Sequence, residues 1–191
     1  MTKIFISDLT HTANGISAQT FPLGASYVAS YAKKMMGDRC EIDLFRFPDK
    51  LSNAIASELP RVACFSNYSW NFELSYRFAK YLKSVDPTIT TVFGGPNFPI
   101  MEKEQFDYLS MRNHIDFYIQ NEGEVALASL LEELEQKNYD AAVLKSSKTV
   151  ISNCVYLSGD QLISGKVDRI MDVNEIPSPY LTGLLDEFFD S

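Results

Sequence analysis

The sequence predicts a doubly wound α/β domain, in which a parallel sheet is covered by helices on both faces. Short apolar runs alternate with amphipathic helical segments over the first two thirds of the 191 residues. Strands that alternate with helices form right-handed βαβ units, so their strands lie parallel. The continuous apolar runs at 61–66 and 89–93 are typical of strands buried on both faces.

The first strand is expected at 3–7, followed by a polar loop over 8–21. Pro22 opens a helix that ends before Gly37, because a proline loses no hydrogen bond in the first helical turn. A helix near 71–85 should bury an apolar face made of Leu74, Phe78, Tyr81, Leu82 and Val85. The other expected elements are strands at 41–47, 61–66, 89–93 and 117–119 and helices at 48–59, 101–111 and 124–136, the last burying Leu127, Leu130, Leu131 and Leu134.

Five such strands suggest a flavodoxin-like parallel sheet with the order 2-1-3-4-5. In such sheets ligands bind outside the carboxyl ends of the strands, where the strand order reverses. The pattern changes after Tyr139, since 149–157 and 161–163 flank a Ser-Gly-Asp turn and predict a β-hairpin. Two prolines within 176–180 predict an extended connector. We therefore expect a Rossmann-like domain at 1–140, and a hairpin and linker at 141–191.

Composition limits the partners. A net charge of −8 repels phosphate backbones and anionic lipids, so neither nucleic acid nor a membrane surface is expected. The chain has no apolar run of the roughly 18 residues that a membrane span needs and no signal-peptide layout, which indicates the cytoplasm. Cys40, Cys64 and Cys154 are odd in number and far apart, so we expect reduced, buried thiols.

The loops that follow four of the strands carry the candidate binding residues. In the first loop, which also contains Asn14 and Gly15, His11 is either a cofactor or metal ligand or an exposed loop histidine. In the third-strand loop, Asn71 or Ser69 is expected to cap the next helix. Trp70 in that loop could cover an aromatic or macrocyclic ligand, or could pack in the core. The candidates in these two loops are Asp8, Thr10, His11, Ser66, Asn67, Tyr68 and Trp70.

The fourth-strand and fifth-strand loops are glycine-containing. Two glycines after the fourth strand allow either a close approach of backbone or ligand, or a turn with positive φ. Acidic residues after the fifth strand suit a helix N-terminus. The candidates here are Gly94, Gly95, Pro96, Asn97, Glu122 and Gly123.

No catalytic constellation is present. The first strand is not followed by Gly-x-Gly-x-x-Gly, and the chain has neither a P-loop nor a Gly-x-Ser-x-Gly elbow. We find no paired nucleophile and base and no metal-ligand spacing, so no catalytic residue and no metal ligand is assigned.

Taken together in their order, five motifs resemble the N-terminal cobalamin-binding domain of cobalamin-binding radical S-adenosylmethionine proteins. The resemblance covers nearly the whole chain. The motifs are Phe-Pro-Leu-Gly-Ala-Ser-Tyr-Val-Ala at 21–29, which resembles the Pro-Leu-Gly helix opening of that family, Phe-Ser-Asn-Tyr-Ser-Trp-Asn at 65–71, Val-Phe-Gly-Gly-Pro at 92–96, Asp-Phe-Tyr-Ile at 116–119 with Glu-Gly-Glu at 122–124, and Ile-Pro-Ser-Pro-Tyr at 176–180.

The resemblance implies a corrin ring over the strand ends, with its nucleotide tail passing Ser66, Gly94 and Gly95. It also implies a radical domain of the same protein after Ser191, holding an iron–sulfur cluster and S-adenosylmethionine. Two features depart from the wider family. The Asp-x-His-x-x-Gly spacing of a cobalt-ligating histidine is not kept around Asp8 and His11, and the three-cysteine cluster motif is missing.

Three functions remain open at this point. The first is a cobalamin-binding module of a larger radical enzyme. The second is a degenerate scaffold without cofactor, used for substrate recognition or interdomain docking, because the bulky Tyr68, Trp70 and Phe98 lie near the predicted crevice. The third is an FMN protein, indicated weakly by Thr10 and Thr12.

Overall fold

The computed structural model describes residues 1–12 and 20–189 and contains a seven-stranded sheet in the order β2-β1-β3-β4-β5-β6-β7. The strands are β1 (Thr2–Ser7), β2 (Cys40–Phe45), β3 (Val62–Ser66), β4 (Thr90–Gly94), β5 (Phe117–Ile119), β6 (Cys154–Ser158) and β7 (Gln161–Ser164). The helices are α1 (Leu23–Met36), α2 (Pro48–Ser57), α3 (Phe72–Val85), α4 (Glu102–Ser110), α5 (Glu124–Gln136) and α6 (Ala141–Ser147), with short 3-10 turns η1 (Gly37–Arg39), η2 (Val173–Glu175) and η3 (Asp186–Phe188).

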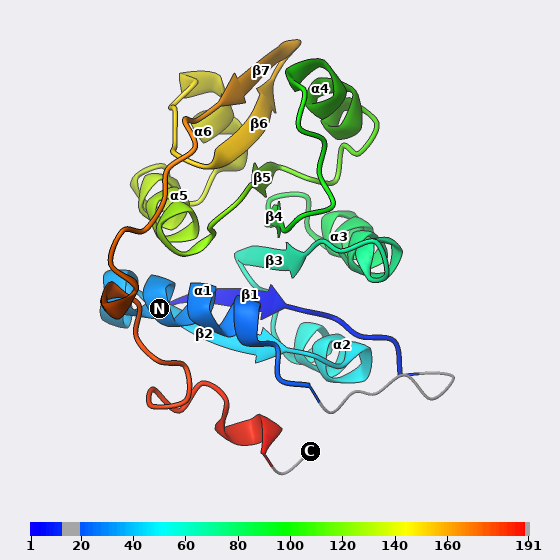
Figure 1. The fold of residues 1–191 in the computed structure, drawn as a ribbon. Helices are drawn as coiled ribbons and strands as arrows, with labels where there is room; N and C mark the ends of the chain where they lie inside the picture. Colours follow the sequence, from blue (N-terminus) through cyan, green and yellow to red (C-terminus); the bar gives the residue numbers. More distant parts are fainter. Residues whose placement is uncertain (13–19, 190–191) are drawn as a thin grey trace.

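The first five strands are parallel in the predicted order 2-1-3-4-5, which confirms the doubly wound fold (Figure 1). The predicted hairpin is also present, and its strand β6 pairs antiparallel with β5, so the hairpin extends the sheet. It begins later than expected, at Cys154, because residues 149–153 form a loop that ends in a turn, in which the Cys154 N–H donates to the Ile151 carbonyl at 3.1 Å. The helix α6 before this loop was not predicted. Asp140 caps α6, accepting hydrogen bonds from the backbone N–H groups of Ala142 and Val143 at 2.9 and 3.1 Å.

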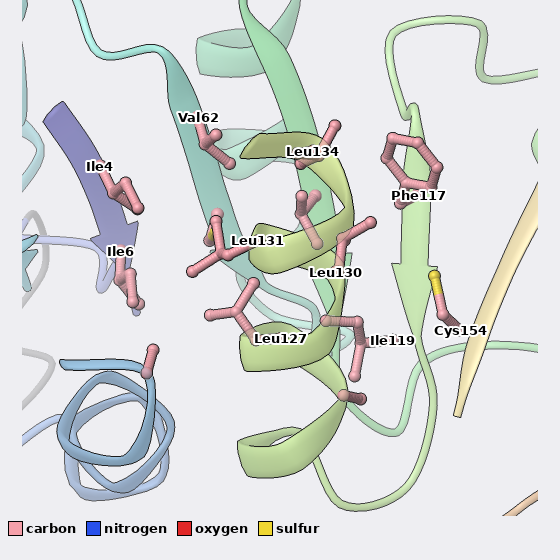
Figure 2. Packing of buried hydrophobic residues seen from close by; sticks show 14 of the residues in the cluster. Ile4, Ile6, Val62, Phe117, Ile119, Leu127, Leu130, Leu131, Leu134 and Cys154 are labelled. Atoms are coloured by element: carbon pink, nitrogen blue, oxygen red, sulfur yellow. The ribbon is translucent and has the colours of Figure 1, made fainter. Parts of the chain in front are cut away.

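Two cores lie on opposite faces of the sheet, because successive strand residues point to opposite sides. Helices α1 and α5 cover one face, where the leucines of α5 pack toward Ile4, Ile6 and Val62 (Figure 2). All four predicted leucines, Leu127, Leu130, Leu131 and Leu134, are buried there. Residues from α2, α3 and α4 join the second core on the other face.

The predicted apolar face of α3 is partly wrong. Tyr81 and Val85 are 54% and 48% exposed, and the fully buried residues of the helix are Ser75, Ala79 and Leu82. The buried face of α3 is therefore rotated by about one residue relative to the predicted face, since Ser75 and Ala79 are fully buried rather than their neighbours Leu74 and Phe78. Small side chains at Ser75 and Ala79 let the helix approach the sheet closely, and this outweighs the apolar periodicity.

Asp116 forms a buried ionic cluster immediately before β5, at the amino end of the parallel strands. Its carboxylate accepts hydrogen bonds from Lys145 at 2.7 Å and from the backbone N–H of Thr91 at 2.9 Å, and it pairs with Lys83 of α3. Burial favours a higher pKa for Asp116, but the attraction of Lys145 and Lys83 outweighs it, so this pKa lies below its ordinary value.

The C-terminal connector returns from the hairpin across α5 and α1 toward β2 (Figure 1). Lys34 of α1 donates to the backbone carbonyl of Glu175 at 2.7 Å. Further along, Phe189 packs against Phe21 with ring centroids 4.9 Å apart, and Leu185 is fully buried. The connector is thus held against the domain at several points.

Candidate functional site

A cavity of about 320 Å³ opens at the carboxyl ends of β1, β3, β4 and β5, between the sheet and the first turns of α1 and α5. The strand order reverses at this point, because β1 lies between β2 and β3. The cavity is lined by Ile6, Asp8, Gly24, Ala25, Val28, Cys64, Phe65, Ser66, Tyr68, Val92, Phe93, Gly94, Gly95, Ile119, Asn121, Glu122, Gly123, Glu124 and Leu127.

The floor of the cavity is apolar and the rim is polar. Ile6, Cys64 and Val92 lie side by side in register across β1, β3 and β4, on the face covered by α1 and α5. A residue two positions further along a strand lies on the same face, about 7 Å nearer its end. The rim residues reached in this way are Asp8, Ser66 and Gly94.

Glycines at the two helix N-termini keep the cavity open. A Cβ at Gly123 would come within 3.1 Å of Val28 Cγ2, so this glycine permits the close approach of α1 to the β5–α5 loop. A Cβ at Gly24 would have no other atom within 4 Å. Larger residues at either position would therefore displace a cavity wall or enter the open space beside it.

A chain of hydrogen bonds fixes the rim. Arg46 donates to Asp8 Oδ2 at 2.8 Å, and Ser66 donates to Asp8 Oδ1 at 2.6 Å. Asn71 donates to Ser66 Oγ at 2.9 Å and accepts from the backbone N–H of Tyr68 at 2.8 Å. Asn71 occupies the N-cap position before α3, but the expected capping hydrogen bond from Asn71 or Ser69 is wrong, because α3 has no side-chain cap and the Asn71 amide instead braces the loop.

The turn after β4 requires glycine at Gly95. Its φ is +128°, and a Cβ would lie 2.7 Å from the backbone oxygen of Asn67. Gly95 therefore has both features expected of the glycine pair, namely a positive φ and a close approach of another backbone segment. Asn67 Nδ2 donates to the backbone carbonyl of Asn97 at 2.9 Å, and Asn97 Nδ2 donates to Asn67 Oδ1 at 3.0 Å. Tyr118 donates to the Gly95 carbonyl at 2.8 Å, so the turn is braced from both sides.

Aromatic side chains stand beside the cavity. Tyr68, which lines it, stacks on Trp70 with ring centroids 4.5 Å apart and planes 11° apart. Trp70 is 63% exposed, so it does not pack in the core. His11 is exposed, and its Nε2 lies 2.9 Å from the Trp70 carbonyl oxygen. Because that oxygen can only accept, Nε2 carries the proton in this contact.

Glu122 joins the cavity to the connector. Its carboxylate accepts from the backbone N–H of Ile170 at 2.6 Å, and its carbonyl accepts from Asn153 Nδ2 at 3.1 Å. Asn153 in turn holds Asp168, exchanging two hydrogen bonds of 2.7 and 2.8 Å with its backbone. One wall of the cavity is therefore tied to residues 168–170.

The structure brings about half of the predicted binding residues to the cavity, and their function as cofactor ligands stays a prediction. Asn14 and Gly15 lie outside the described residues. Those that line the cavity are Asp8, Ser66, Tyr68, Gly94, Gly95, Glu122 and Gly123, whereas Thr10, His11, Asn67, Trp70, Pro96 and Asn97 lie outside its lining.

The apolar floor and the helix residues Gly24, Val28 and Leu127 were missing from the predicted site. Two signals could have found them. The floor residues stand two positions before the predicted rim residues on the same strands, and Gly24 belongs to the Pro-Leu-Gly motif.

The described residues offer no metal centre. No group of three or more His, Cys, Asp or Glu side chains converges within 1–12 and 20–189. Burial raises the pKa of Cys64 to about 12, so the thiol in the cavity floor stays protonated at neutral pH and is a poor metal ligand. Over the same residues, no helix has the length and apolarity to cross a bilayer.

An open, glycine-edged cavity at the switch point of a doubly wound sheet defines a cofactor- or ligand-binding domain. Residues 13–131 match the family model described as "B12 binding domain". The match spans more than half of the chain, and the chain therefore belongs to the B12-binding domain family.

The chain is similar to part of two cobalamin-dependent radical enzymes. It is 29% identical over 128 residues to the cobalamin-dependent radical SAM methyltransferase TokK of Streptomyces tokunonensis, which covers 66% of this chain and 17% of TokK. It superimposes on the cobalamin-dependent S-adenosylmethionine radical enzyme OxsB, with aqua-cobalamin and S-adenosylmethionine bound, with a TM-score of 0.68 at 15% identity. That match covers 98% of this chain and 25% of OxsB, so the chain spans a quarter or less of these relatives.

Proposed function

We propose that the chain binds cobalamin, with the nucleotide tail in the cavity and the corrin ring outside it, over the carboxyl ends of the strands. The observation that carries this proposal is the cavity of about 320 Å³ in a member of the B12-binding domain family. Its volume is at the lower end of the roughly 300–1,000 Å³ of small-molecule sites. That space suits a nucleotide-sized group and is too small for a corrin macrocycle.

The residues present fit such a tail. Gly94 and Gly95 expose backbone beside the path of the tail, and the N-termini of α1 and α5 face the cavity, where backbone N–H groups favour a phosphate. Arg46 offsets the charge of Asp8 at 2.8 Å, which reduces repulsion of a phosphate at the rim. Asp8, Ser66 and the glycines would therefore shape and orient the site.

Tyr68 and Trp70 would offer the ring a flat surface next to the mouth of the cavity. Their stacked pair is preformed, since the ring planes differ by only 11°. His11 lies outside the lining and is held by the Trp70 carbonyl, so we assign it no cobalt-ligating role.

We further propose that the chain acts with a radical S-adenosylmethionine domain, because the relatives that it matches are radical S-adenosylmethionine enzymes of which it covers a quarter or less. Bound cobalamin would supply group-transfer or redox chemistry. The described residues contribute binding and positioning, and the iron–sulfur cluster and S-adenosylmethionine would belong to the other domain.

The scaffold alternative requires aromatic residues that fill the site. Phe98 instead stacks on Tyr118 at 3.8 Å on the second core, and Trp70 stacks on Tyr68 at the surface. Neither Phe98 nor Trp70 belongs to the lining of the cavity, which therefore stays open and favours cofactor binding.

Titration of the 191-residue chain with hydroxocobalamin, followed by corrin absorption, tests the proposal. We expect saturable binding at micromolar cofactor and a shift of the corrin absorption bands, because the bound corrin would exchange water for a protein environment. Gly24→Leu should weaken binding while the chain stays folded by circular dichroism. An unchanged spectrum and no retained cobalt would overturn the proposal.

A further inference from the structure

We propose that the cavity floor selects corrinoids by their lower base, accepting the apolar 5,6-dimethylbenzimidazole of cobalamin and rejecting the adenine of pseudocobalamin. This inference rests on the proposed function, because it requires the nucleotide tail to enter the cavity. The lower base is the terminal group of that tail, so it would reach the floor.

The floor presents almost no hydrogen-bonding side chain. Ile6, Cys64 and Val92 form its row on the sheet, and Val28 and Leu127 face them from α1 and α5. Cys64 carries the only polar atom of these five side chains, and a protonated thiol is a weak donor and a weak acceptor.

Backbone groups do not make up for this. Ile6, Cys64 and Val92 lie in three adjacent strands inside the sheet, so their N–H and C=O groups belong to the parallel ladder. On the strands that form the floor, the next polar side chains on the same face are Asp8 and Ser66, two residues nearer the mouth, and they are already engaged with Arg46, Asn71 and each other.

The two bases differ in polarity at the end that would reach the floor. The fused benzene ring of dimethylbenzimidazole presents only C–H and methyl groups, whereas adenine presents ring nitrogens and an exocyclic amine. A polar group buried without a partner weakens binding by about ten- to a hundredfold. We therefore expect pseudocobalamin to bind about ten- to a hundredfold more weakly than cobalamin.

A hydroxyl introduced into the floor should reduce this preference. Val92→Thr keeps the side-chain shape and adds a donor and acceptor, and it should narrow the affinity ratio several-fold. Val62→Thr is the matched control. Val62 lies in β3 and is fully buried on the same face of the sheet as Val92, but it does not line the cavity. Cys64→Ser is a second floor variant for use if Val92→Thr does not fold.

The test is equilibrium titration of the 191-residue chain and these variants with cobalamin and with pseudocobalamin, read by absorbance. A ratio of ten or more in the parent chain and in Val62→Thr, reduced in a floor variant, supports the inference. Equal affinities for the two corrinoids in the parent chain would overturn it and leave the proposed function intact. A ratio that the floor variants leave unchanged would overturn the role of the floor. If neither corrinoid binds, the proposed function itself fails.

Discussion

Ser66 donates a 2.6 Å hydrogen bond to the carboxylate of Asp8 and thereby joins the carboxyl ends of β3 and β1 at the rim of the cavity. Arg46 holds the other oxygen of the same carboxylate at 2.8 Å. The strand ends at the switch point are therefore fixed to each other by side chains as well as by the sheet, which gives the cavity a rigid edge.

Removal of this hydrogen bond should destabilise the domain. Ser66→Ala leaves Asp8 and Asn71 each without one partner, and hydrogen bonds to charged groups contribute about 1.5–3 kcal/mol. We expect the free energy of unfolding in urea to fall by about that amount. Ser164→Ala, at an exposed position of β7, should change it by less than about 0.5 kcal/mol. Equal effects of the two substitutions would contradict the bracing role of Ser66.

Two glycines at the cavity should respond in opposite ways to alanine. Gly95→Ala places a Cβ 2.7 Å from the Asn67 oxygen at a φ of +128°, so we expect a loss of at least about 1–3 kcal/mol in thermal or urea unfolding. Gly24→Ala lies in the first turn of α1 with no atom within 4 Å and should stabilise the fold by about 0.5–1 kcal/mol. Stabilisation by Gly95→Ala would disprove the strained turn.

Glu122 should control the connector near Ile170. Glu122→Ala removes the acceptor of the Ile170 N–H at 2.6 Å, and hydrogen–deuterium exchange of that amide should become faster by tenfold or more. Glu122→Gln keeps a carbonyl oxygen and should change the exchange rate much less. Similar rates in the parent chain and in Glu122→Ala would show that the connector does not depend on this contact.

Asp116 makes stability depend on acid pH. Its pKa is lowered in the folded state, so its contribution is fully present above the unfolded value of about 3.9 and is lost as pH falls through the lower folded value. Asp116→Asn should cost about 3–5 kcal/mol at pH 7, because Lys83 and Lys145 lose their counter-charge. Urea unfolding at pH 7 and below pH 3 measures both effects. The difference between parent and variant should shrink at the lower pH, and a constant difference would contradict the ion cluster.

The parallel strand order could be predicted from the regular alternation of strand and helix segments in the sequence. The buried face of α5 could be predicted from the helical spacing of its leucines. The buried face of α3 could not, since Ser75 and Ala79 are buried for close approach to the sheet and Tyr81 is left exposed. Helix α6 was missed because it has only seven residues and its main signal is the Asp140 cap.

The rim of the cavity was predictable from its position, because polar residues at the carboxyl ends of parallel strands meet at one edge. Side-chain direction within each loop was not. Asn67 and Asn97 turn away to brace the Gly95 turn, and only the backbone geometry of that turn determines this. The floor residues were hidden because Ile6 and Val92 have the same character as the core around them.

The affinity of the 191-residue chain for hydroxocobalamin relative to cobinamide, which has the corrin ring but no nucleotide tail, tests tail binding in the cavity most directly. We predict that cobalamin binds at least tenfold more tightly, because only its tail can bury surface against Ile6, Cys64 and Val92. Equal affinities for the two compounds would contradict tail binding in this cavity.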